Sequence, residues 1–138
     1  MPVTYLNTVG PAQCDRQGFM ATRHYMGIVA EAVPNLLVEA GGDDRSRGRI
    51  GGAALEYRFV YHRAPREGDV ITLHSAVKEV GPKAYKLGHW LLDASTGDAL
   101  ATSEAVVVLF DLDARKAITI PDDRRAALEG LIVPDLSV

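Results

Sequence analysis

A single change of hydrophobic period constrains the fold of this chain more than any other feature. From residue 25 to residue 40, apolar side chains recur at the spacing of one helix face. That face holds Tyr25, Val29, Ala32, Val33, Leu36 and Ala40. After residue 54 the period falls to two, which is typical of a half-buried strand. The alternating residues are Leu55, Tyr57, Phe59 and Tyr61. The pattern predicts one amphipathic helix followed by strands.

Turn and cap residues set the expected element boundaries. Thr22 is a good N-cap for the helix, Gly41-Gly42 ends it, and Pro34 predicts a kink or two helical pieces. The remaining elements are a short strand at 3–9, strands at 70–80, 83–93 and 99–110, a short piece at 118–120 and a helix at 121–131. Serial strands with a segregated helix favour an α+β fold with a mainly antiparallel sheet. Residues 1–138 form one domain by length.

Charge and composition argue against several classes of protein. The net charge of −3 argues against a general nucleic-acid binder. Cys14 is the one cysteine, so no intrachain disulfide can form, and we expect a reducing, cytoplasmic location. The first residues do not have the pattern of a signal peptide, and no apolar run approaches the roughly 20 residues that cross a bilayer. We therefore expect no membrane partner.

Four motifs in order carry a resemblance to a known family. They are Cys14 through Tyr25 (CDRQGFMATRHY), Arg63 through Asp69 (RAPREGD), Thr96 through Ala101 (TGDALA) and the passage from Phe110 to Pro121. Together they resemble the 4-hydroxybenzoyl-CoA thioesterase-like family. The resemblance implies the hotdog fold, in which a five- to six-stranded sheet wraps a long central helix. It implies hydrolysis of an acyl-CoA by a homodimer or homotetramer, with no cofactor because CoA is part of the substrate.

The resemblance also assigns site residues. Asp15 matches the family's catalytic aspartate, which acts as nucleophile or as general base. The backbone at Thr22 and Arg23 matches the donor that polarises the thioester. The expected substrate-binding residues are Gly18, Phe19, Met20 and Tyr25. The chain departs from the family in two ways: Phe19 and Thr22 stand where many relatives have histidine, and Ala21 and Thr22 replace common asparagines.

The residues support this chemistry without the resemblance. Thioester hydrolysis needs an attacking oxygen, hydrogen-bond donors for the developing oxyanion, and a slot for the acyl group. Asp15 precedes a glycine-containing loop that enters a helix, where free N–H groups and the helix dipole favour negative charge. The alternative is that Asp15 only stabilises a turn. Phe19 and Met20 can line the acyl slot or pack in the core.

Other candidate groups are weaker. Glu31 lies about 160° from the apolar centre of the helix, so we expect it to face solvent or a neighbouring subunit. Cys14 could be a nucleophile with His24 as base, although no third residue orients the histidine. The other histidines are too scattered to predict a metal site: His62, His74 and His89.

Two alternative functions remain open. A hotdog hydratase or dehydratase typically has an Asp-x-Asn-x-x-His type motif, which this chain lacks. A non-catalytic acyl-CoA-binding module would be marked by loss of the acid, and Asp15 is present. Basic residues at strand ends and turns could contact CoA phosphates: Arg63, Arg66, Lys83, Lys86, Arg115 and Lys116. Scattered cations on a surface do not single out one of them.

Overall fold

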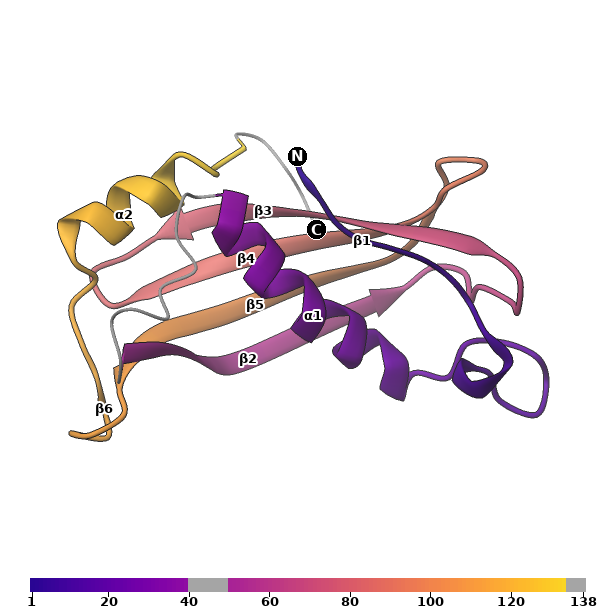
Figure 1. Cartoon of the computed structure of the whole chain (residues 1–138), viewed down its shortest axis with the longest axis horizontal. Helices are drawn as coiled ribbons and strands as arrows, with labels where there is room; N and C mark the ends of the chain where they lie inside the picture. Colours follow the sequence, from indigo (N-terminus) through magenta and orange to yellow (C-terminus); the bar gives the residue numbers. More distant parts are fainter. Residues whose placement is uncertain (40–49, 134–138) are drawn as a thin grey trace.

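An antiparallel sheet curves around one long helix in the computed structural model of the chain, which describes residues 1–39 and 50–133. The strands are β1 (Val3–Thr8), β2 (Ile50–Tyr61), β3 (Val70–Val80), β4 (Ala84–Asp93), β5 (Ala99–Asp111) and β6 (Lys116–Ala117). The helices are α1 (Arg23–Glu39), α2 (Asp122–Glu129) and the short 3₁₀ turn η1 (Pro11–Gln13). The strand order is β1-β3-β4-β5-β2, with β6 beside β5 (Figure 1). This architecture confirms the expected α+β class.

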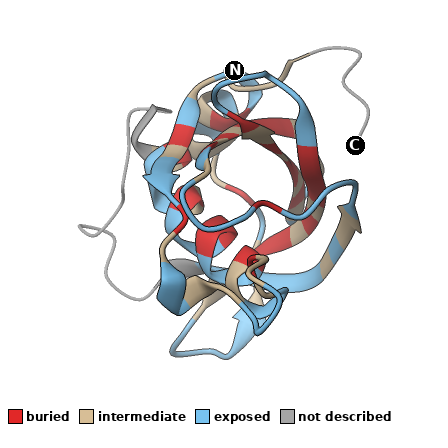
Figure 2. Cartoon of the chain, turned by 90° about the vertical axis from the view of Figure 1, so that its right-hand side faces the viewer, coloured by how far each residue is buried: buried red, intermediate tan, exposed pale blue. Residues whose placement is uncertain are grey.

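The core lies between α1 and the concave face of the sheet. Viewed along the strands, buried residues line the inside of the curved sheet and the side of α1 that faces it (Figure 2). Four residues of the predicted helix face are buried: Tyr25, Val29, Ala32 and Leu36. Ile28 joins them and Val33 is half-buried, whereas Ala40 lies outside the described residues. The predicted β3 face is also buried, with Ile71, Leu73 and Val77 each at most 2% exposed.

The start of α1 agrees with the sequence, and one of the two alternatives expected at Pro34 is excluded. α1 begins directly after Thr22. It runs as a single helix with Pro34 inside, so the chain does not split into two helical pieces there. The Asn35 side chain donates to the Thr4 carbonyl at 2.7 Å, which ties α1 to β1. The predicted stop at Gly41-Gly42 lies outside the described residues.

Two strand expectations are wrong in detail. Leu55 was expected on the half-buried face of β2, but it is 67% exposed. The pairing with β5 shifts between Ala54 and Glu56, so Leu55 is the extra residue of a β-bulge and turns away from the core. The short strand expected at 118–120 is β6, two residues earlier, where Lys116 and Ala117 pair with the end of β5. In the described part of the chain, no helix is long and apolar enough to cross a membrane.

Candidate active site

Asp15 lies in a tight hairpin between η1 and α1. Cys14 pairs with Met20, and the Asp15 N–H donates to the Phe19 carbonyl at 2.7 Å. Gly18 closes the turn by donating to the Asp15 carbonyl at 3.1 Å, and its φ of +83° is a conformation that favours glycine. The role expected for Gly18 is therefore first a conformational one, because it lets the chain reverse beside the carboxylate.

The Asp15 carboxylate has one oxygen engaged and one available. Oδ1 accepts hydrogen bonds from the N–H groups of Gln17 at 2.8 Å and Phe19 at 3.2 Å. Oδ2 has no hydrogen-bond partner within residues 1–39 and 50–133, and the residue is exposed. The first oxygen orients the group, as an Asx turn does. The second can accept a proton from water or approach a carbonyl carbon.

The hairpin is held against the loop that follows β2. The Met20 N–H donates to the Pro65 carbonyl at 2.8 Å, and Phe19 pairs with Arg66. The Arg66 guanidinium lies 4.9 Å from the centre of the Phe19 ring, within the range of a cation–π contact. The position of Asp15 therefore depends on residues 65 and 66.

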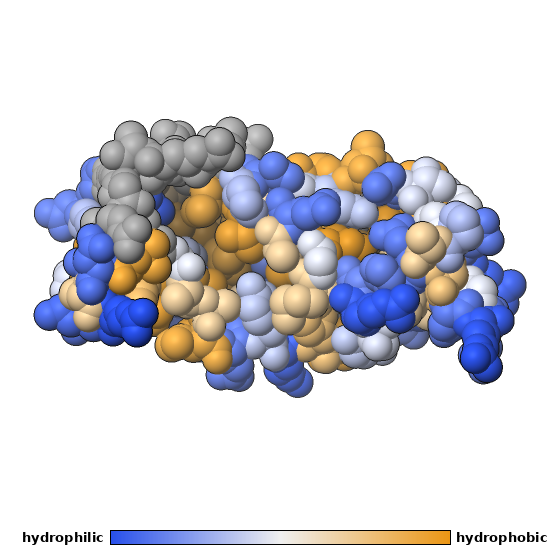
Figure 3. All heavy atoms as spheres, turned by 60° about the horizontal axis from the view of Figure 1, so that its bottom comes forward, coloured by the Kyte–Doolittle hydropathy of each residue, from blue (hydrophilic) through white to orange (hydrophobic). Residues whose placement is uncertain are grey.

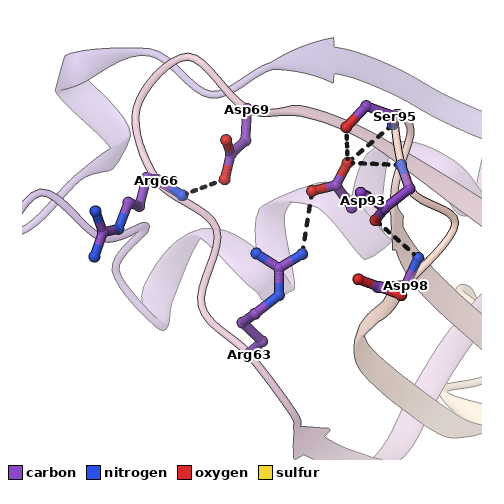
Figure 4. A network of polar contacts seen from close by, with 7 residues as sticks. Arg63, Arg66, Asp69, Asp93, Ser95 and Asp98 are labelled. Atoms are coloured by element: carbon purple, nitrogen blue, oxygen red, sulfur yellow. Dashed lines mark hydrogen bonds and ion pairs between the residues drawn. The ribbon is translucent and has the colours of Figure 1, made fainter.

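A network of polar contacts stabilises the loop that follows β2 (Figure 4). Arg63 reaches Asp93, at the end of β4, with a 3.1 Å contact to Oδ2. The other carboxylate oxygen of Asp93 accepts from the Ser95 hydroxyl at 2.7 Å and the Ser95 N–H at 2.9 Å. These Ser95 bonds, followed by Arg63, lower the pKa of Asp93 to about 2. The Arg66 N–H donates to the Asp69 carboxylate at 2.8 Å, which fixes the turn.

The start of α1 offers backbone donors beside the hairpin. Ala21 donates to the Gln13 carbonyl at 2.9 Å, so the hairpin leads directly into the helix. The first helical bonds run from His24 to Ala21 and from Tyr25 to the Thr22 carbonyl. The N–H groups of Thr22 and Arg23 have no acceptor in the described chain. Such free groups at a helix start attract negative charge.

The expected acyl-slot residues differ in exposure. Met20 and Tyr25 are buried at 3% and 4% exposure and belong to the core cluster under α1. Their packing is what the core interpretation predicts. The Tyr25 ring meets Tyr61 edge to face at a centroid distance of 4.8 Å, and its pKa is raised by burial and by Tyr61. Phe19 is half-buried, with the Arg66 guanidinium over its ring, so its ring is more accessible than the side chains of Met20 and Tyr25.

The structure also places the competing candidates. Glu31 is exposed, as expected from its helix position. The Cys14 thiol is half-buried and donates to the Gly10 carbonyl at 3.5 Å. His24 has a buried Nε2 without a hydrogen-bond partner in the described chain. The described residues contain no cluster of three or more potential metal ligands.

His89 is a buried polar residue that the sequence did not single out. It is 0% exposed and lies on the core face of β4 between Leu87 and Leu91. Its Nδ1 is 2.7 Å from the Ser75 hydroxyl on β3. The signal for both residues was their place in the period-two pattern, where each occupies a position otherwise filled by apolar residues.

Comparisons with known proteins agree with this fold. A family model described as thioesterase-like superfamily matches residues 9–128. The probable thioesterase YbaW from Escherichia coli is 18% identical, with a TM-score of 0.79, over 94% of this chain and 98% of that one. A 1,4-dihydroxy-2-naphthoyl-CoA thioesterase from Synechocystis is also 18% identical, with a TM-score of 0.81, over 96% and 98%.

A Staphylococcus aureus protein, described as hypothetical and solved in complex with CoA, has a TM-score of 0.85 at 16% identity, over 99% of this chain and 88% of that one. At such identities these structures establish the fold. A search of curated proteins finds no match to the sequence. Because the family model covers most of the chain, this protein belongs to the thioesterase-like superfamily.

Proposed function

We propose that this protein is an acyl-CoA thioesterase that hydrolyses its substrate to a carboxylic acid and free CoA, with Asp15 as the catalytic group. The observation that carries the proposal is the Asp15 carboxylate, which has one oriented oxygen and one free oxygen on a hairpin that enters α1. The family supports thioester hydrolysis, and the neighbours described as CoA thioesterases or as bound to CoA support the substrate class.

The proposed reaction uses two parts of the site. The thioester oxygen accepts hydrogen bonds from the N–H groups of Thr22 and Arg23, which stabilise negative charge as it develops. A water molecule attacks the carbonyl carbon while Asp15 takes its proton. The tetrahedral intermediate then collapses and the C–S bond breaks. The CoA thiolate takes the proton back from Asp15, which leaves the carboxylic acid and regenerates the carboxylate.

The Asp15 carboxylate contacts the N–H of Phe19, three residues before Thr22. A water molecule between the carboxylate and the thioester carbon lets Asp15 act as a general base without touching that carbon.

Replacing Asp15 with asparagine tests the proposal. Asn keeps an oxygen that can accept from Gln17 and Phe19, so the hairpin is retained while the base is lost. The value of kcat for the best acyl-CoA should fall by at least about 100-fold, with little change in substrate binding. The measurement is release of free CoA from a panel of acyl-CoAs.

Two matched variants identify the responsible group. Glu31→Gln removes another exposed carboxylate, and Cys14→Ser removes the thiol next to Asp15. Both should stay within several-fold of the parent. Circular dichroism and thermal unfolding check that the Asp15→Asn protein is folded. If that folded protein releases CoA at the parental rate, Asp15 is not the catalytic group. A parent that binds acyl-CoA without hydrolysing it would instead be a binding module.

A further inference from the structure

A groove opens between α1 and β2 on the concave side of the sheet. In Figure 1, α1 crosses β2 near the start of the helix and ends over β3 and β4, so its second half lies away from β2. The groove has a volume of about 270 Å³, which is room for a chain of several carbon atoms. Its lining includes Ala30, Val33 and Leu37 from α1, with Gly52, Ala54 and Tyr57 from β2.

One face of α1 leads from the start of the helix to this groove. Alternating steps of three and four residues place five residues on that face: Arg23, Met26, Ala30, Val33 and Leu37. The Arg23 N–H is one of the two donors proposed above for the thioester oxygen. Met26 is 40% exposed and Ala30 is exposed, so the face is open between this donor and the groove.

Aromatic rings on β2 form the opposite wall. Tyr57 lines the groove, and its ring stacks on that of Phe59 at a centroid distance of 6.2 Å. Phe59 stacks in turn on Tyr61 at 6.1 Å, and Tyr61 meets Tyr25 in the first turn of α1. The row of rings therefore extends from the start of α1 to the groove.

The chemistry of the groove favours an apolar occupant. None of its described lining residues is charged. A carboxylate or an ammonium placed there would lose hydration without gaining an ion pair from the lining. Burial of a methylene group is favourable, because the hydrophobic effect grows with the apolar area removed from water. A hydrocarbon chain therefore suits both the shape and the lining.

We propose that the groove binds the distal part of a straight, medium- to long-chain acyl group whose thioester lies at the start of α1. The inference rests on the proposed function and names its substrate class. Measured from Arg23, Ala30 lies about 10 Å and Leu37 about 21 Å along the helix. An extended hydrocarbon chain rises about 1.3 Å per carbon, so about 8 carbons reach Ala30 and about 16 reach Leu37.

The main-chain edge of β2 stays free in this arrangement. The lining residues of β2 face the concave side of the sheet, whereas the edge presents its N–H and C=O groups in the plane of the sheet. A second copy of the chain can therefore pair along β2 while the acyl chain lies in the groove.

A homologous series of substrates tests the assignment. The probes are saturated straight-chain acyl-CoAs with even numbers of carbons from four to eighteen, each used below its critical micelle concentration. Between about 8 and 16 carbons, kcat/KM should rise by about threefold or more for each added pair, because each pair buries two further methylene groups. A profile that is flat or falls over this interval overturns the proposal and leaves the groove to a second copy of the chain.

Gly52 offers a way to block the groove from β2. A Cβ at Gly52 would lie 3.3 Å from the Tyr85 hydroxyl and 3.4 Å from Val107 Cγ1, so a valine there fills the space beside these side chains. Gly52→Val should lower the ratio of kcat/KM for the sixteen-carbon to the eight-carbon substrate by about tenfold or more. Ala53→Val is the matched control, because Ala53 is the next residue of β2, faces the other side of the sheet and is not a lining residue.

Ala30→Leu narrows the groove from α1 and keeps the test decisive if the Gly52→Val chain does not fold. Ala30 is exposed, so a leucine can replace it without disturbing the core. The sixteen-to-eight ratio should fall several-fold in this variant. Glu31→Leu, which adds a leucine on another face of α1, should leave the ratio unchanged. A ratio that stays parental in each folded variant of the Ala30 and Gly52 pair overturns the assignment.

A binding measurement separates the groove from the chemistry. The ligands are S-alkyl-CoA thioethers of eight, twelve or sixteen carbons, which have no carbonyl to hydrolyse. Isothermal titration calorimetry should show tighter binding and a more negative heat-capacity change as the chain lengthens, and Gly52→Val should weaken the longest ligand most. That result supports the subsite even if the parent hydrolyses no acyl-CoA, which would refute only the proposed function. Equal affinity for the three lengths refutes the subsite even if acyl-CoAs are hydrolysed.

Discussion

His89 binds a proton less readily in the folded chain than in the unfolded one. Burial lowers its pKa from the ordinary 6.5 to about 4. Above pH 6.5 the ring is neutral in both states, so the residue adds no pH dependence there. As the pH falls from 6.5 towards 4, the unfolded chain takes up the proton first and the folded state loses stability. The full effect is about 3 kcal/mol.

The free energy of unfolding should therefore fall between pH 7 and pH 4.5 by about 2 to 3 kcal/mol from this residue. Urea unfolding at several pH values measures it, and His89→Leu should flatten the curve over the same interval. Asp93 does not interfere, because its lowered pKa of about 2 confines the loss of its contribution to below about pH 4. Parallel curves for the two proteins would show that His89 is hydrated in the folded state.

Phe19 is the residue whose role at the hairpin is most open to a substrate test. Its half-buried ring contacts the Arg66 guanidinium, so Phe19→Ala removes a cation–π contact of about 0.5–1 kcal/mol together with some apolar burial. If the ring lines the acyl slot, the ranking of acyl-CoAs by kcat/KM should change. A lower melting temperature with an unchanged ranking would assign Phe19 to packing alone.

The loop after β2 acts at the scale of elements, because it joins the hairpin to the β4–β5 turn. Its Pro65 carbonyl holds Met20, and its Arg63 contacts Asp93. Arg63 is 49% exposed, so the ion pair adds only roughly 0–1 kcal/mol to overall stability. Its effect should instead be local, on the position of the loop and therefore of Asp15.

Arg63→Gln should lower kcat several-fold while the melting temperature changes little. Hydrogen exchange at the Met20 amide should become faster, because the Pro65 carbonyl is less firmly placed. Lys78→Gln is the matched control, since it breaks a 2.8 Å ion pair with Glu104 that does not involve the loop or the hairpin. Equal effects of the two variants on kcat would argue against positioning by Arg63.

Local patterns predicted the elements well where the period is regular. Helix α1 and strands β3 to β5 follow from hydrophobic spacing and turn residues, because both act within a few positions. At Asp15 the local sequence predicts only a glycine-containing loop, and the structure shows that this loop is a hairpin. Leu55 was misplaced because a β-bulge adds one residue, and a single insertion moves a side chain to the other face.

The pairing of the buried His89 with Ser75 and Ser103 could not be derived from the sequence, because it depends on the register between strands. If the chain reversed at the centres of the two predicted turns, Gly81-Pro82 and 95–98, then His89 on β4 would pair with His74 on β3 and with Glu104 on β5. The structure pairs it instead with Ser75 and Ser103. Beside each turn the strands pair two residues away from the expected register, and the shifts between Val77 and Glu79 and between Leu91 and Leu92 each recover one of the two. The one-residue difference that remains exchanges the core face for the outer face.

At the scale of the whole molecule, β2 forms a long sheet edge that no described strand pairs with. β2 ends the strand order, and Leu55 and Tyr61 on it are exposed, as is Met26 on α1. A groove of about 270 Å³ lies between α1 and β2, lined by Ala30, Val33, Pro34, Gly52, Ala54 and Tyr57 among others. Apolar residues gather across the middle of this side of the molecule, with hydrophilic ones at its ends (Figure 3). Unpaired edges and apolar patches favour association.

We therefore expect a homodimer or a homotetramer in which a second copy covers β2. Light scattering coupled to size exclusion should give at least twice the monomer mass of 14.9 kDa at micromolar concentration. Leu55→Lys places a charge on the edge strand and should shift the equilibrium towards monomer. Lys116→Leu, on β6, is a control that should leave the assembly unchanged. A parent protein that elutes as a monomer contradicts this assembly.

The hairpin that carries Asp15 is fastened mainly through main-chain atoms. Cys14 pairs with Met20, Ala21 donates to the Gln13 carbonyl, and Met20 donates to the Pro65 carbonyl. These bonds do not depend on which side chains the residues carry. The exposed Arg16 and Gln17 can accordingly be randomised while the carboxylate stays in place. A library that varies these two residues could therefore change which substrates the hairpin contacts without moving the Asp15 carboxylate.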